Sequence, residues 1–262
     1  MDMDLKLAGK VAIVTGGSKG IGYQTAKQFA AEGAQVVICA RGEKQLQVAK
    51  DSIFVQTGKE ILAVRADVSK EKDCQLLIQQ AIEKFGRIDI LVNNAGTAAA
   101  NPFEQVTTEG WQHDLDLKLF GAIHCAKLAI PHMRAVGAGS IVNLTAIGGK
   151  NPGPSSMPTS VSRAAGLALM KAMSKDIGKD NIRVNAVCIG LIRSDQIEKR
   201  WQSVAPELTW EEFSKQEGAS IPLGRVGEAE EAANMIVFLS SPAASYITGT
   251  AVNIDGGTAN SY

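Results

Sequence analysis

The chain has 262 residues, of which 45% are hydrophobic, and its 27 basic and 27 acidic side chains give a formal net charge of zero. This length and apolar content suit one α/β domain over residues 1–262 better than two small domains. The charge balance gives no reason to expect nucleic acid or an anionic membrane as a partner, so we expect a small-molecule ligand.

The four cysteines lie far apart within apolar segments. They have neither the spacing of a metal site nor that of a disulfide framework, which favours a reducing compartment and no bound metal. The amino terminus has no basic stretch followed by a long apolar run. We therefore expect a cytoplasmic protein.

Short apolar runs alternate with longer segments of helical period, a pattern typical of a parallel sheet covered on both faces. The expected strands are 10–15, 35–39, 61–66, 88–93, 140–144, 182–187 and 251–254. The expected helical stretches are 20–32, 43–56, 71–85, 103–136, 158–178 and 227–240. Right-handed crossovers make this a Rossmann-like, doubly wound sheet of about seven parallel strands, with its ligand beyond their carboxyl ends.

The first crossover, residues 15–22, has the sequence TGGSKGIG between an apolar run and a helical pattern. Its glycines allow a sharp turn and a close approach of the backbone to a pyrophosphate, and the helix amino terminus offers free N–H groups. A tight β–α connection without a ligand is the alternative. The expected phosphate-binding residues are Gly16, Ser18, Lys19, Gly20, Ile21 and Gly22.

The residue after the second strand indicates which dinucleotide is bound. An acidic residue there would accept bonds from the ribose 2′-hydroxyl of NAD, whereas a basic residue would pair with the 2′-phosphate of NADP. This chain has Arg41, and Lys19 in the glycine turn adds a second cation, so NADP(H) is expected and NAD(H) less so. Two solvated surface cations are the alternative. The other expected cofactor contacts are Asp67, Val68, Asn94, Ala95, Gly96, Arg163 and Ile192.

A long irregular stretch, residues 191–222, follows the sixth expected strand and contains two tryptophans and two arginines. Substrates bind at the loops beyond the strand ends of such a sheet. This position favours a small helical lid over the substrate, with an ordinary surface excursion as the alternative.

Taken together, these motifs resemble the short-chain dehydrogenase/reductase family over essentially the whole chain. The matching segments are 15–22, 67–68, 88–96, 141–143, 246–249 and 255–257. The resemblance implies a dinucleotide-dependent oxidoreductase acting on CH–OH groups. It also implies a homotetramer or homodimer built on the helices at 103–136 and 158–178 and on the last strand, 251–254, or a hetero-oligomer with an active sister subunit.

Members of this family use a tetrad of Asn, Ser, Tyr and Lys, and all four positions differ here. Alignment through the flanking motifs places Lys118 at the Asn position, Ala146 at the Ser position, Thr159 at the Tyr position and Arg163 at the Lys position. The three tyrosines of the chain, residues 23, 246 and 262, all lie elsewhere. The usual phenol is therefore absent in any register.

These replacements weaken the chemistry that the family normally uses. An aliphatic hydroxyl is a far weaker acid than a phenol, and losing a positioned acid costs roughly 10²–10⁴-fold in rate. Arg163 stays charged and does not relay a proton as a lysine does. Lys118 is a substitute donor if burial lowers its pKa, whereas His113 and His124 are weaker candidates. Lys118 and Arg163 together would favour an anionic ligand.

Two hypotheses follow. One is an NADP(H)-binding silent or regulatory subunit, or a very weak carbonyl reductase. The other is an active oxidoreductase with a non-standard proton donor, acting on an anionic or activated carbonyl. A hydrolase- or lyase-like reuse of the pocket ranks last, because no nucleophile–base pair is visible.

Overall fold

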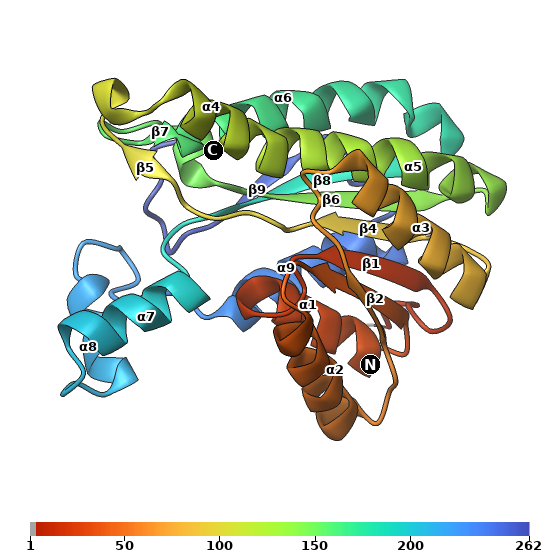
Figure 1. Cartoon of the computed structure of the whole chain (residues 1–262), viewed down its shortest axis with the longest axis horizontal. Helices are drawn as coiled ribbons and strands as arrows, with labels where there is room; N and C mark the ends of the chain where they lie inside the picture. Colours follow the sequence, from red (N-terminus) through yellow and green to blue (C-terminus); the bar gives the residue numbers. More distant parts are fainter. Residues whose placement is uncertain (1–3, 262) are drawn as a thin grey trace.

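The computed structural model describes residues 4–261 and shows a central sheet between two layers of helices (Figure 1). Its main strands are β1 (Val11–Thr15), β2 (Gln35–Ala40), β3 (Leu62–Arg65), β4 (Ile90–Asn93), β6 (Gly139–Ala146), β8 (Ile182–Ile189) and β9 (Ala251–Ile254). They are hydrogen-bonded in the order β3-β2-β1-β4-β6-β8-β9, and every pairing is parallel. The predicted Rossmann-like sheet of seven strands is confirmed.

Each face of the sheet carries its own layer of helices (Figure 1). On one face lie α1 (Gly20–Ala31), α2 (Glu43–Thr57) and α9 (Ala229–Ser240). On the other lie α3 (Glu71–Phe85), α5 (Gly121–Ala135) and α6 (Thr159–Asp176). Side chains of β1 alternate between the two cores, so that Ala12 and Val14 pack on one side and Ile13 on the other. This two-sided burial explains why the strands have continuous apolar sequences.

The single helical stretch predicted at 103–136 is wrong in detail. It consists of η1 (Phe103–Gln105), α4 (Thr108–Leu115), a π-helical turn η2 (Asp116–Phe120) and α5. A π-helical turn of five residues inside a long helix is too short to give a hydrophobic pattern of its own, so spacing does not reveal it. The turn determines where Lys118 points.

Other departures from the predicted elements are small. The strands β6 and β8 continue two residues beyond the predicted ends at 144 and 187, to Ala146 and Ile189. A short antiparallel ribbon, β5 (Ala100–Asn101) with β7 (Met157–Pro158), was not predicted. Both of its strands are too short to give an alternating pattern.

The stretch predicted as a lid contains α7 (Asp195–Val204) and α8 (Trp210–Glu217), which stand apart from the sheet (Figure 1). These helices share a small core of their own with the segment before α9. Its buried members are Ala205, Trp210, Phe213 and Val226. Closure over a ligand stays a prediction, as does the assignment of residues 1–262 to one domain.

Among residues 4–261, no helix is both long enough and apolar enough to cross a membrane. All four cysteines are buried and unpaired by disulfides. Within the same residues, no group of three or more His, Cys, Asp or Glu side chains is placed to hold a metal ion.

Candidate active site

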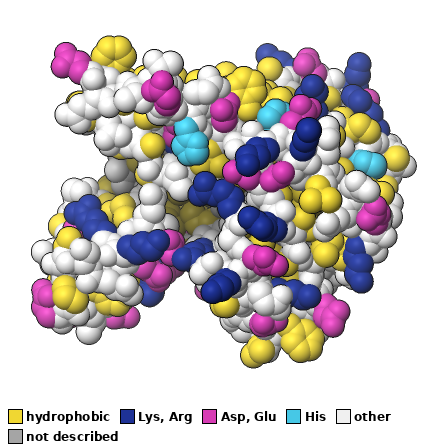
Figure 2. Space-filling model, in the orientation of Figure 1, with side chains coloured by type: hydrophobic (Ala, Val, Ile, Leu, Met, Phe, Trp, Pro, Cys, Tyr) yellow, Lys and Arg dark blue, Asp and Glu magenta, His cyan; other side chains and the backbone are white. Residues whose placement is uncertain are grey.

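A cavity of about 750 Å³ lies at the carboxyl ends of the strands, between the sheet and α7. Figure 2 shows the surface hollowed beside the α7–α8 segment. This volume lies within the range of known ligand sites, roughly 300–1,000 Å³. All fourteen predicted cofactor-contacting residues line it: Gly16, Ser18, Lys19, Gly20, Ile21, Gly22, Arg41, Asp67, Val68, Asn94, Ala95, Gly96, Arg163 and Ile192.

The glycine turn has the geometry that its sequence predicts. Gly16 and Gly20 have φ values of +65° and +54°, which favour glycine. A Cβ on Gly22 would collide with the carbonyl oxygen of Gly16 and the side-chain amide of Asn94. The same amide donates to the carbonyl oxygens of Thr15 at 2.8 Å and Gly16 at 3.1 Å, which fixes the turn to the end of β4.

The amino terminus of α1 faces this cavity, and no side chain caps it. Its free N–H groups and the positive end of the helix dipole suit a pyrophosphate. The residues present therefore fit a dinucleotide at this end of the cavity.

The two cations predicted at the adenosine end, Lys19 and Arg41, both line the cavity. Arg41 is exposed at the end of β2 and lines the cavity with Gln45. The Lys19 ammonium group donates to Asp195 at the start of α7 at 2.8 Å, and this bond lowers the pKa of Asp195. Lys19 thus links the glycine turn to the α7–α8 segment.

The reaction end of the cavity contains three of the four tetrad positions. Ala146 at the end of β6, Thr159 at the start of α6 and Arg163 one turn later all line the cavity. Lys118 does not. Its side chain is only 3% exposed and lies behind Thr159. Its role as a substitute proton donor stays a prediction.

Lys118 belongs to a buried chain of polar side chains. Its ammonium group donates to the Asp114 carboxylate, which is 3% exposed, and to Thr159 Oγ1 at 2.7 Å. The other oxygen of Asp114 accepts a hydrogen bond from Ser162 at 2.6 Å. The order along the chain is therefore Ser162, Asp114, Lys118 and Thr159, and only Thr159 reaches the large cavity.

Sequence reasoning missed Asp114 and Ser162. Asp114 precedes Lys118 by four residues, a spacing that brings opposite charges together on a helix, so this pair could have been found. Ser162 gives no such signal, because α6 meets the π-helical turn only in the folded chain.

The pairing changes the electrostatics that the sequence predicts. Asp114 compensates the charge of Lys118, so the two predicted cations do not act together on a ligand. Burial lowers the pKa of Lys118, the hydrogen bond to Asp114 acts in the opposite direction, and the nearby Arg163 charge lowers it further. The net result is a pKa below the ordinary lysine value.

Arg163 keeps an incompletely satisfied guanidinium group. Its Nη1 donates to the carbonyl oxygen of Leu144 at 2.7 Å, and its Nη2 approaches Gly96. Its Nε is buried and has no partner among the described residues. Burial also lowers the pKa of Arg163. An unpaired buried donor beside the cavity favours a ligand that accepts hydrogen bonds.

No other described side chain supplies the missing phenol. The Tyr23 hydroxyl is hydrogen-bonded to Ser52 on α2 at 2.8 Å, and Tyr246 is fully exposed. Neither tyrosine lines the cavity, and the same is true of His113 and His124. Tyr262 lies outside the described residues.

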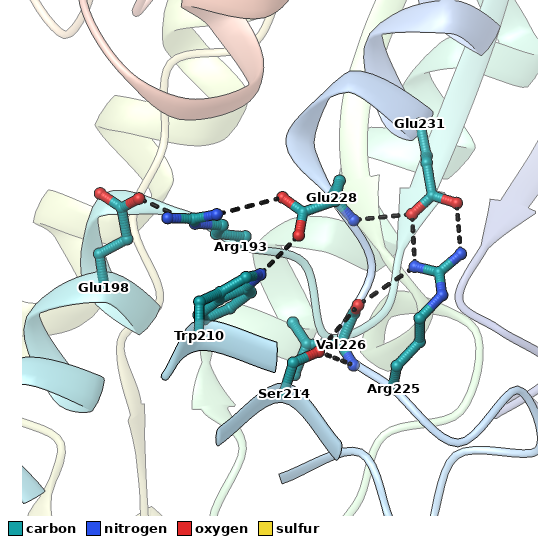
Figure 3. A network of polar contacts seen from close by, with 8 residues as sticks. All are labelled: Arg193, Glu198, Trp210, Ser214, Arg225, Val226, Glu228 and Glu231. Carbon is teal, nitrogen blue, oxygen red and sulfur yellow. Dashed lines mark hydrogen bonds and ion pairs between the residues drawn. The ribbon is translucent and has the colours of Figure 1, made fainter. Parts of the chain in front are cut away.

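The α7–α8 segment is anchored to the start of α9 by the polar network in Figure 3. Arg193 donates to Glu198 at 2.9 Å, forms an ion pair with Glu228 at 3.8 Å and stacks 4.3 Å above the ring centre of Trp210. The Trp210 indole N–H donates to Glu228 at 2.6 Å. A cation–π contact and a charge-assisted bond hold this segment against the start of α9.

The fold, the glycine turn and the strand-end cavity are those of a Rossmann-like dinucleotide-binding protein. Residues 16–259 match the family model described as enoyl-(acyl carrier protein) reductase. The chain belongs to the short-chain dehydrogenase/reductase family.

Among its curated relatives is the 3-oxoacyl-(acyl-carrier-protein) reductase of Chlamydia muridarum, 34% identical over 98% of this chain and 100% of the relative. L-sorbose reductase from Gluconobacter frateurii, solved with NADPH and L-sorbose, is 33% identical with a TM-score of 0.92, over 99% of this chain and 100% of its own.

A short-chain oxidoreductase from Pseudomonas aeruginosa PAO1 containing an atypical catalytic center is similar as well. It is 32% identical with a TM-score of 0.93 over 98% of this chain and 99% of its own. Its NADPH-bound structure has a TM-score of 0.91, with coverages of 97% and 99%. Structures of this family therefore include a catalytic centre that departs from the usual pattern.

Proposed function

We propose that this protein is an active NADP(H)-dependent oxidoreductase that interconverts a carbonyl and an alcohol with a non-standard proton donor. The observation that carries the proposal is one continuous cavity. It runs from the uncapped start of α1 to Thr159, which is hydrogen-bonded to the buried Lys118. A dinucleotide site and a source of protons thus border the same space.

The cofactor end supports NADP(H) rather than NAD(H). Gly16, Gly20 and Gly22 shape the turn, while Lys19 and Arg41 supply two cations at the adenosine end. Reduced nicotinamide, when bound, supplies the hydride in this chemistry. The relatives solved with NADPH are consistent with this choice.

At the reaction end, Arg163 supports an anionic or strongly polarised substrate. Its charge has no carboxylate of its own, because both oxygens of Asp114 are engaged by Lys118 and Ser162. A guanidinium group that lines a partly closed cavity stabilises negative charge that develops on a substrate oxygen. In the family, a serine hydroxyl at the position of Ala146 binds the substrate oxygen. Arg163 would replace part of that stabilisation here.

A silent or regulatory subunit is the second candidate, and the loss of the serine hydroxyl at Ala146 is the observation in its favour. The buried chain from Ser162 to Thr159 argues against it, since a degenerate site has no need of a desolvated lysine hydrogen-bonded to a residue that borders the cavity. Activity is also the property named for the relatives that we compared. We propose a homo-oligomer in the cytoplasm, with a hetero-oligomer belonging to the silent alternative.

Single-turnover kinetics of the isolated protein tests the proposal. NADPH binding is first measured by fluorescence titration, and loss of bound NADPH absorbance is then followed against neutral and anionic carbonyl compounds. We expect turnover, faster with the anionic members, and a loss of at least about 10-fold in Arg163→Ala. The matched control is Lys175→Ala, on the exposed side of α6. NADPH binding without turnover of any compound, with activity appearing only beside a partner subunit, would show the silent subunit instead.

A further inference from the structure

Thr159 is the point at which the buried polar chain meets the ligand cavity. It is half-buried at the first position of α6 and borders the cavity beside Ala146 and Arg163. The other end of the chain is closed, because Asp114 and Ser162 are both buried. Any exchange of protons between Lys118 and a ligand in the large cavity therefore has Thr159 as its contact.

The direction of the hydrogen bond leaves the hydroxyl proton of Thr159 available. A lysine ammonium group has three donors and no acceptor, so Lys118 donates and Thr159 Oγ1 accepts at 2.7 Å. Among the described residues, Oγ1 has no second partner. The O–H of Thr159 can then be directed only toward the cavity or a ligand within it.

We propose that Thr159 is the catalytic proton donor of this enzyme, that Lys118 replaces the proton through the same hydroxyl, and that Asp114 is the positioning residue for Lys118. This inference rests on the proposed function, because it names the group that protonates the substrate oxygen in that reaction. It places the donor at the start of α6 and the residue that replaces the donated proton on the π-helical turn before α5.

Each proton that the substrate takes is replaced from Lys118. As the carbonyl carbon is reduced, its oxygen gains the electron pair of the C=O π bond and takes the proton of Thr159. In the same event an N–H of Lys118 moves to Oγ1, so the hydroxyl is restored and the lysine becomes neutral. After the alcohol leaves, water in the cavity returns a proton to Lys118 through Thr159. No free alkoxide of threonine forms, which removes the objection that an aliphatic hydroxyl is too weak an acid.

The surroundings of Lys118 suit this role. Two charged side chains act on its ammonium group, Asp114 from α4 and Arg163 from α6. Burial and Arg163 make the lysine a stronger acid than usual, while Asp114 keeps it from losing its proton altogether. Both oxygens of Asp114 are occupied, so its contribution is to orient and hold the charge of Lys118.

The pair of variants Thr159→Val and Thr159→Ser tests the donor. Valine has nearly the shape of threonine without the hydroxyl, whereas serine keeps the hydroxyl. We expect single-turnover reduction to fall about 10²–10⁴-fold in Thr159→Val and less than about 10-fold in Thr159→Ser. NADPH affinity should be unchanged in both, which also shows that they fold. Equal rates in wild type and Thr159→Val would overturn the assignment.

The variant Asp114→Asn tests the relay behind the threonine. Reduction needs charged Lys118, so its rate should fall as pH rises through the pKa of that lysine. Removing the Asp114 charge removes a contribution that raises this pKa, and the falling limb should move to lower pH. The pKa is measured independently by NMR of ¹³C-labelled lysine in the cofactor-free protein, with Asp176→Asn as the exposed control.

The outcomes separate the two proposals. A wild-type protein without turnover overturns the proposed function and this inference together. Turnover that survives in Thr159→Val overturns the relay alone. So does an Asp114→Asn variant in which the NMR pKa of Lys118 moves while the pH dependence of the rate does not. If Asp114→Asn fails to fold, Lys118→Met takes its place, and unchanged activity in that variant would contradict the relay.

Discussion

The two ends of the strand-end cavity are built by different means. At the cofactor end, backbone conformation makes the site: positive φ values at Gly16 and Gly20, no room for a side chain on Gly22, and an uncapped helix. At the reaction end, side chains from α4, the π-helical turn and α6 make the site.

This difference explains why one end matches its family closely while the other departs from it. A backbone site tolerates few substitutions, because a Cβ on Gly16 or Gly22 enters space that another atom occupies and Gly20 has a positive φ. A side-chain site keeps its function if a different residue brings an equivalent donor to the same point. In the proposed mechanism, Lys118 at the family's asparagine position contacts Thr159. The family's usual lysine would stand one turn later on α6, where this protein has Arg163.

Among these variants, Gly22→Val should have the largest effect, because it removes the space that the glycine turn needs at the cofactor end. Its branched side chain cannot coexist with the Gly16 carbonyl oxygen and the Asn94 amide in their present places. We expect NADPH affinity, measured by fluorescence titration, to fall about 100-fold or more, equal to roughly 2.7 kcal/mol. The lysine NMR pKa of Lys118 should stay unchanged. Gly148→Ala is the control, because a Cβ there meets open space.

Arg41→Ala sharpens the comparison at the adenosine end. Losing charge-assisted bonds to the 2′-phosphate should weaken NADPH binding roughly 10- to 100-fold and leave NADH binding nearly unchanged. Competition titrations with both dinucleotides measure the ratio. Lys44→Ala, on the exposed face of α2, should change neither affinity. Equal losses for NADPH and NADH would contradict the assignment of Arg41.

Asp89→Asn, just before the central strand β4 and at the amino-terminal end of the sheet, separates fold stability from both ends of the site. Burial alone would raise the pKa of Asp89, but hydrogen bonds from Arg87, the Val11 N–H and Lys10 outweigh it and lower the pKa. We expect a loss of about 1–3 kcal/mol in the free energy of unfolding at neutral pH, measured by urea denaturation. NADPH affinity should not change.

The pH dependence of that loss has a definite sign. A carboxyl with a lowered folded-state pKa stabilises the protein fully above its unfolded pKa, near 3.9, and loses this contribution as pH falls through the folded value. The difference between wild type and Asp89→Asn should therefore shrink in acid. A difference that grows as pH falls would show that Asp89 acts in another way.

Local features of the sequence were sufficient for the fold and for the outline of the cofactor end. Continuous apolar runs such as 11–14 specify strands buried on both faces, and glycines at fixed spacing specify the turn between β1 and α1. Both signals arise within a few residues. The predicted cofactor-contacting residues consequently line one cavity, although their individual roles stay predictions until a ligand is bound.

The sequence by itself also determined that the usual phenol is missing and that Lys118, Ala146, Thr159 and Arg163 stand at the tetrad positions. Only the tertiary structure decided what they do together. It placed Lys118 behind Thr159 instead of in the cavity, paired it with Asp114, and left Arg163 without a carboxylate. The physical reason is that burial and hydrogen-bond partners, which control the acidity of a side chain, depend on the packing of α6 against the π-helical turn, 41 residues away in sequence.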